Sequence, residues 1–157
     1  DVNLISQDSS YPIWQREDAI GRKYWGVSNF CGLDRKQIKS TQDLSQLEWD
    51  GNEIYLDAQT DEEVKSLLIK AVGILLYWKR VLEYQYPETQ FYFFASYDNG
   101  DMLILDEGEL PTHSVTLRFW ADRGTDTMIN LDFFNDWEQP AIVGYCNFAP
   151  PDLKCTP

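Results

Sequence analysis

The sequence predicts an α+β fold in which an antiparallel β-meander packs against one long amphipathic helix. Two observations carry this prediction: a helical spacing of apolar residues over Thr60–Tyr86, and a series of β-prone segments after Pro87 that are separated by turn residues. The chain has 157 residues, the length of one domain, and no repeat or long linker divides it. We therefore expect one domain over residues 1–157, with an extended, proline-rich tail over 149–157.

The long helix has the strongest pattern. Apolar residues recur at steps of three and four and so fall on one face: Val64, Leu67, Leu68, Ala71, Leu75, Trp78 and Leu82. Thr60 and Glu63 have the spacing of a capping box, and acidic residues in the first turn favour the positive end of the helix dipole. Pro87 prevents much continuation of the helix.

The predicted sheet follows the helix. Asn99-Gly100 has the residues of a tight hairpin turn, so we expect Phe91–Tyr97 and Met102–Leu105 to pair directly. Ser114–Ala121 alternates apolar and polar residues as a half-buried strand does. Three further segments have strand composition: Glu53–Asp57 before the helix, Thr127–Phe133 and Ala141–Phe148.

The region before residue 53 is less regular. Asp34–Leu47 predicts one short helix, over either Asp34–Lys39 or Thr41–Leu47, and Asp50-Gly51 predicts a turn. Tyr11–Phe30 contains apolar residues without a clear period, so it predicts no particular element.

The composition limits the classes of function. The chain has 26 acidic and 13 basic residues, a formal charge of -13, and 43% hydrophobic residues. Such an aromatic-rich chain is globular rather than disordered, and its charge disfavours binding to nucleic acid or to anionic membranes. No segment has the length and apolarity of a membrane helix. We expect a cytoplasmic protein, a monomer or weak dimer, with a basic partner.

The cysteines and the single histidine indicate little chemistry. Cys31, Cys146 and Cys155 match no metal or redox spacing, so we expect reduced thiols; a Cys146–Cys155 bridge in an exported protein is the alternative. His113 and its neighbour Ser114 would point to opposite faces of a strand and could not pair in catalysis.

Known catalytic and metal-binding motifs are also missing from the sequence. Asp98–Asp101 and Asp50–Glu53 resemble fragments of calcium loops, but neither continues with EF-hand spacing. Carboxylates and aromatic residues could form a carbohydrate site, although 26 acidic residues would supply suitable pairs by chance. We therefore expect no enzyme activity, no cofactor and no bound metal.

The charge is unevenly distributed. Residues 1–80 hold 13 acidic and 10 basic residues, whereas residues 81–157 hold 13 acidic and 3 basic ones. Two windows lack Lys and Arg entirely, Asp43–Glu63 and Asp98–Glu109. Acidic groups concentrated at strand ends can steer a cationic partner, and aromatic residues among them can anchor it. The predicted partner-binding residues are Asp98, Asp101, Asp106, Glu107, Glu109, Asp132, Asp136 and Trp137.

These features together resemble the immunity proteins of bacterial polymorphic-toxin and contact-dependent inhibition systems. The resemblance rests on a small acidic α+β chain, the helix Thr60–Tyr86 followed by the meander Phe91–Phe133, and acidic-aromatic segments such as Asp132–Glu138. It includes no defining motif, so no family residue is transferred to a position here. It implies a non-catalytic inhibitor that binds a cognate cationic toxin domain, for example a nuclease. The alternatives are a nucleic-acid mimic that inhibits a DNA-binding enzyme, and a carbohydrate-active or carbohydrate-binding domain.

Overall fold

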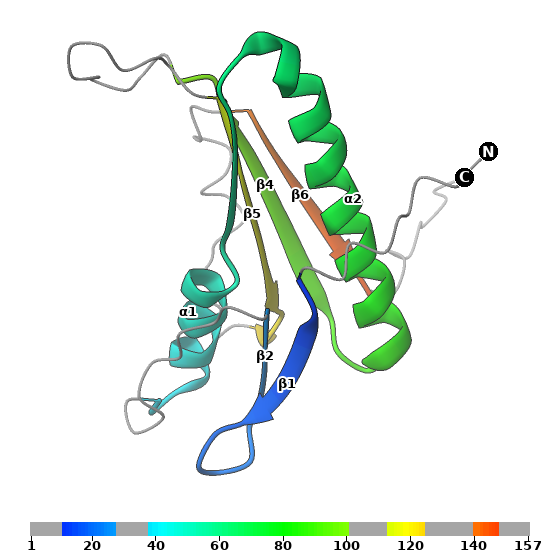
Figure 1. Cartoon of the computed structure of the whole chain (residues 1–157). Helices are drawn as coiled ribbons and strands as arrows, with labels where there is room; N and C mark the ends of the chain where they lie inside the picture. Colours follow the sequence, from blue (N-terminus) through cyan, green and yellow to red (C-terminus); the bar gives the residue numbers. More distant parts are fainter. Residues whose placement is uncertain (1–10, 28–37, 101–112, 125–139, 148–157) are drawn as a thin grey trace, which may run out of the picture.

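The structure is a computed structural model that describes residues 11–27, 38–100, 113–124 and 140–147. The described residues form two antiparallel sheets and two helices, which confirms the α+β class (Figure 1). In chain order the elements are β1 Ile13–Glu17, β2 Lys23–Val27, α1 Thr41–Gly51, β3 Ile54–Ala58, α2 Asp61–Gln85, β4 Phe91–Asp98, β5 His113–Ala121 and β6 Ala141–Cys146.

The larger sheet has the strand order β3-β5-β4-β6, and every neighbouring pair is antiparallel. The prediction of a β-meander is therefore wrong, because the strands do not lie side by side in their chain order. β3 and β4 run parallel to each other with β5 between them, and α2 makes the crossover that joins them. The periodicity of a strand reports its faces but not its neighbours, so the sequence pattern could not show this order.

Both edges of β4 are occupied, by β5 on one side and by β6 on the other. This pairing corrects the prediction that β4 forms a tight hairpin with the segment after Asn99-Gly100. Met102–Leu105, Thr127–Phe133 and the tail 149–157 lie outside the described residues. The strand predicted over Ser114–Ala121 is confirmed as β5, and β3 and β6 match the other two predicted strands within two residues.

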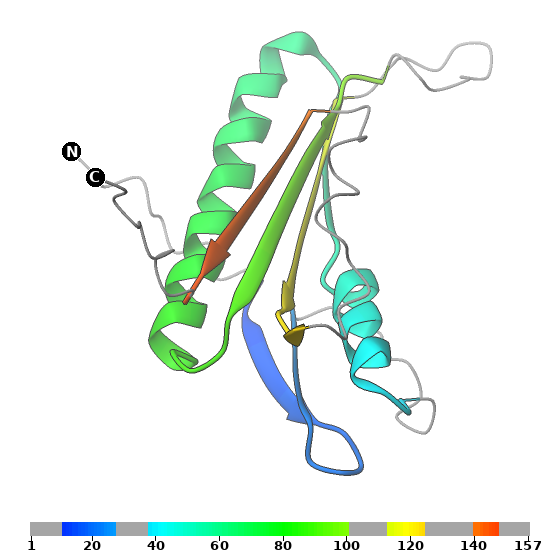
Figure 2. The same cartoon turned by 180° about the vertical axis from the view of Figure 1, so that it is seen from behind.

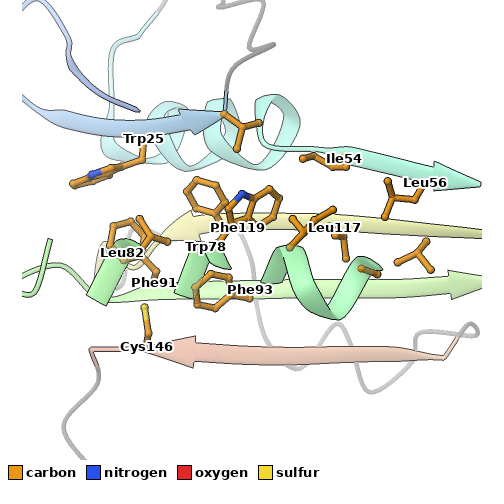
Figure 3. Close-up of a cluster of buried hydrophobic side chains, with 14 of the residues drawn as sticks. Trp25, Ile54, Leu56, Trp78, Leu82, Phe91, Phe93, Leu117, Phe119 and Cys146 are labelled. Carbon is orange, nitrogen blue, oxygen red and sulfur yellow. The ribbon is translucent and has the colours of Figure 1, made fainter. Parts of the chain in front are cut away.

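Helix α2 matches the predicted Thr60–Tyr86 almost to the residue. Its buried residues are Leu67, Ala71, Ile74, Trp78 and Leu82, which recur at the predicted spacing and face the sheet. Figure 3 shows how Trp78 and Leu82 meet Phe91, Phe93, Leu117 and Phe119 of the sheet to form the core. Leu68, assigned to the same face by its spacing, is exposed, because one narrow stripe suffices to cover a single sheet layer.

The predicted capping box at Thr60 does not form. Thr60 is the N-cap residue without a side-chain cap bond, and the Glu63 carboxylate accepts a hydrogen bond from the Gln59 backbone N–H instead. A full capping box occurs in α1, where the Ser40 hydroxyl accepts from Asp43 N–H and Asp43 accepts from Ser40 N–H. Backbone donation from Lys39 and Ser40 lowers the pKa of Asp43 below its usual value.

The N-terminal region contains a β-hairpin that the sequence pattern did not predict. β1 pairs with β2, and the Asp18 carboxylate organises the turn by accepting from the backbone N–H groups of Ile20 and Arg22. β2 is buried on both faces, since Tyr24 packs in a small cluster against α1 whereas Trp25 belongs to the main core. A strand that is covered on both faces shows no alternation, and the period of two is lost.

Helix α1 decides between the two options for the short helix and corrects one prediction. The second option, Thr41–Leu47, is the correct one, extended to Gly51, and α1 covers the sheet in addition to the long helix. Asp50 and Gly51, predicted as a turn, are the last residues of this helix. Figures 1 and 2 show α1 and α2 on opposite faces of the larger sheet. Trp49 of α1 accordingly packs on Trp120 and Phe94, which lie on the face away from α2.

A buried polar network fixes α1 to the rest of the molecule. Glu48 is 0% exposed and its carboxylate accepts from the backbone N–H groups of Trp25 and Ala121 and from the Arg123 guanidinium. One helical turn later Asn52, also 0% exposed, accepts from Val27 N–H and donates to the carbonyls of Trp25 and Phe119. The network therefore connects α1, β2 and β5 through fully buried groups.

Replacing Glu48 should destabilise the fold strongly. Glu48→Ala leaves the Arg123 guanidinium and two backbone N–H groups without their buried acceptor, and breaking such a pair costs roughly 3–5 kcal/mol. Urea denaturation measures the free energy of unfolding. Glu53→Ala is the control, because Glu53 pairs with Arg118 at a partly exposed site where we expect a loss of at most about 1 kcal/mol. Equal losses in the two variants would contradict this role of Glu48.

Cys146 should be unreactive in the folded protein. It carries a free thiol in the core, and burial, with a contribution from Glu83, raises its pKa to about 11. Because the thiolate is the reactive form, iodoacetamide at pH 8 should leave Cys146 unmodified until urea unfolds the chain. Peptide mass spectrometry separates it from Cys31 and Cys155. Rapid modification of Cys146 without denaturant would show that the thiol is exposed.

Candidate functional site

One end of the larger sheet gathers carboxylates from three elements. Asp57 of β3 and Asp98 of β4 are both in register with Ser114 of β5, so they lie in one row across the sheet, with backbones roughly 10 Å apart. The first turn of α2 adds Asp61, Glu62 and Glu63 at the same end, because β3 leads directly into α2. These five residues, Asp57, Asp61, Glu62, Glu63 and Asp98, are called the acidic end below.

Two other carboxylates of the same stretch of chain are neutralised. Glu48 and Glu53 pair with Arg123 and Arg118, two of the three basic residues that follow residue 80. Arg118 and Arg123 are thus engaged near α1, and the exposed carboxylates at the opposite end of β3 are Asp57, Asp61, Glu62 and Glu63. The fold adds Asp98 of β4 to carboxylates that already lie close together in the sequence between residues 57 and 63.

His113 links the acidic end to the sheet. Its Nε2 lies 2.7 Å from Asp61 Oδ1, and its Nδ1 lies 2.7 Å from the Tyr97 hydroxyl, whose ring is stacked with the imidazole. An ionised carboxylate only accepts hydrogen bonds, so Nε2 donates to Asp61 and Nδ1 of a neutral ring accepts from Tyr97. The His113 side chain is only 16% exposed.

Ser114 takes no part in this cluster. It is the neighbour of His113 on β5 and lies on the other face of the sheet, as expected from strand geometry. His113 is therefore held by Tyr97 and Asp61, with both ring nitrogens engaged. This arrangement ties the first residue of α2 to the ends of β4 and β5 and fixes the position of the exposed carboxylates beside it.

A groove begins at the acidic end and follows β3. It has a volume of about 580 Å³ and lies between β3 and α2, with Leu56 and Leu67 among its apolar groups and Asp57, Glu63 and Lys70 among its charged ones. A second hollow of about 220 Å³ continues along Ile54 and Tyr55 toward Val27. Tyr11 borders both hollows.

The structure describes only one of the eight predicted partner-binding residues. Asp98 lies at the acidic end, where its carboxylate also accepts from Gly100 N–H. Asp101, Asp106, Glu107, Glu109, Asp132, Asp136 and Trp137 lie outside the described residues. Four acidic-end residues lie in the window Asp43–Glu63 but are not among the predicted partner-binding residues: Asp57, Asp61, Glu62 and Glu63. The signal that could have selected them is a window without Lys or Arg at a junction between a strand and a helix.

Within the described ranges, no three side chains of His, Cys, Asp or Glu converge as a metal site requires. No helix in the described part of the chain is long and apolar enough to cross a membrane.

Comparison with protein-family models, with curated proteins and with solved structures found no match to this chain. The function is therefore inferred from the charge, the groove and the surrounding geometry.

Replacing His113 should loosen the start of α2. His113→Phe keeps a ring to stack on Tyr97 but removes both ring nitrogens, and each lost hydrogen bond typically costs about 0.5–1.5 kcal/mol. We expect faster amide hydrogen exchange in the first two turns of α2. Tyr97→Phe is the control, because it removes only the bond to Nδ1 and should give a smaller effect. Unchanged exchange in His113→Phe would show that the cluster does not hold the helix terminus.

Proposed function

We propose that this protein is a non-catalytic binder of a basic protein partner. The observation that carries the proposal is the acidic end, where β3, β4 and α2 bring five carboxylates together beside a groove. Like charges at one place oppose folding, and they are useful when a cationic surface docks there and neutralises them. The formal charge of -13 supports the same class of partner.

The buried and partly buried polar clusters support binding over catalysis. Glu48, Asn52 and Arg123 hold elements together, and Asp18 with Arg22 shapes a turn. His113 joins Asp61 of α2 to Tyr97 of β4 and so holds the start of the helix against the sheet. In the described residues these polar groups already have structural roles.

Within this class, the proposed partner is a cognate basic toxin domain, and the protein acts as its immunity protein. A toxin that cleaves nucleic acid presents Lys and Arg for phosphate contacts, and an acidic surface that binds them would block its substrate site. Asp101, Asp106, Glu107, Glu109, Asp132, Asp136 and Trp137 remain proposed members of this surface. The gene beside the one encoding this chain is the first source of a candidate partner.

Charge reversal at the acidic end should slow association with that partner. Asp57→Lys combined with Glu62→Lys removes the local field, and steering of this kind typically raises association rates by about 10- to 1,000-fold. We expect the association rate at low salt to fall by at least about tenfold, with a weaker dependence on salt. Stopped-flow fluorescence measures both quantities.

The matched control is Glu17→Lys combined with Glu88→Lys, which makes the same change in net charge at exposed sites away from the acidic end. We expect it to slow association much less. If both double variants slow association equally, only the net charge matters. If neither does, the partner docks elsewhere and the proposal fails.

A further inference from the structure

β3 is the edge strand of the larger sheet in the part of the chain that the structure describes. It is the first strand in the order β3-β5-β4-β6, and among the described residues it pairs only with β5. The outer side of such a strand presents backbone N–H and C=O groups that can pair with another chain. Tyr55 and Asp57 point to the face away from α2 and are exposed, whereas Ile54, Leu56 and Ala58 are buried on the face toward α2.

Helix α2 forms the second wall beside this edge. Its groove-lining residues are Glu63, Ser66, Leu67 and Lys70, which recur at three- and four-residue steps and so belong to one face of the helix. The volume of about 580 Å³ lies within the range of about 300–1,000 Å³ that is usual for binding pockets. The second hollow extends the groove along β3 to Ile54.

A groove between an edge strand and a helix suits an extended peptide. The peptide adds a strand to the sheet through main-chain hydrogen bonds, and its alternate side chains enter the groove between strand and helix. The remaining side chains would lie beside Tyr55 and Asp57 on the opposite face. The groove would take one set of side chains, and the opposite face of the sheet would take the other.

The charges of the groove select a basic occupant. Asp57 and Glu63 outnumber Lys70 among its charged lining residues, and Asp61 and Glu62 precede Glu63 in the first turn of α2. The chain's own residues 1–10 precede Tyr11, which borders the groove, but they contain two Asp and no Lys or Arg. Charge complementarity thus favours a cationic segment of another protein over this part of the chain.

We infer that an extended basic segment of the partner binds along β3 as an added strand, with side chains in the β3–α2 groove. This inference rests on the proposed function and specifies how the partner is held. The acidic end raises the association rate, and strand addition lowers the dissociation rate of the complex.

The test uses the full chain and a capped peptide, Lys-Val-Lys-Val-Lys-Val, labelled for fluorescence polarisation. The bound peptide should slow hydrogen exchange of the β3 amides that do not pair with β5, as measured by NMR. A Glu-Val peptide of the same length should bind at least about tenfold more weakly, as should a Lys-Val peptide with N-methyl groups on alternate residues.

Groove variants make the test specific. Ser66→Trp fills the groove from the exposed side of α2 and should weaken peptide binding by at least about tenfold. Ile69→Trp is the matched control, because Ile69 is exposed on the same helix and does not line the groove. Circular dichroism verifies that both variants are folded, and the control should bind within about twofold of the parent chain.

Three results would overturn the inference. The β3 amides could be unchanged at saturating peptide, they could already be protected in the free protein because another segment covers the edge, or Ser66→Trp and Ile69→Trp could bind equally well. If a basic protein partner still binds with salt-dependent kinetics in any of these cases, the proposed function stands and only the strand addition fails.

Discussion

The buried Glu48–Asn52–Arg123 network is the constraint on which the other parts of the structure depend. Glu48 and Asn52 are one turn apart on α1 and hold the backbones of β2 and β5, so the N-terminal hairpin, the first helix and the sheet share one set of buried hydrogen bonds. A buried carboxylate is costly unless it is fully paired, and Glu48 satisfies this condition with two backbone N–H groups and a guanidinium. α1 is thereby fixed on one face of the sheet.

With α1 on one face, the other face is left for α2 and the main core. The chain runs from α1 into β3 and then into α2. Helix α2 crosses the sheet, so that β4 lies beside β5 on the side opposite to β3 (Figures 1 and 2). The same crossover makes β3 an edge strand and sets the start of α2 beside it. The groove and the acidic end are consequences of this path of the chain, and His113 secures it by linking Asp61 to Tyr97.

The sequence predicted the elements that are amphipathic and missed those that are not. α2, β3 and β5 have one buried face each, and their spacing of apolar residues predicted them closely. β2 is buried on both faces and has no alternation, so the hairpin was missed. Asp50 and Gly51 have a high turn propensity, but they are helical in the structure. The buried Asn52 side chain, which hydrogen-bonds to the Trp25 carbonyl, overrides this propensity and holds the end of α1 in place. Of the predicted partner-binding residues, the structure describes Asp98, which lies at the acidic end.

The sequence by itself determined the α+β class, the long helix, the total charge and the lack of a recognisable catalytic motif. These are properties of composition and local periodicity, which act over a few residues. Only the tertiary structure decided the strand order, the pairing of Arg118 and Arg123 with Glu53 and Glu48, and the meeting of Asp98 with the carboxylates at the start of α2. Contacts between residues far apart in the chain settle those features, and no local pattern encodes which strand lies beside which.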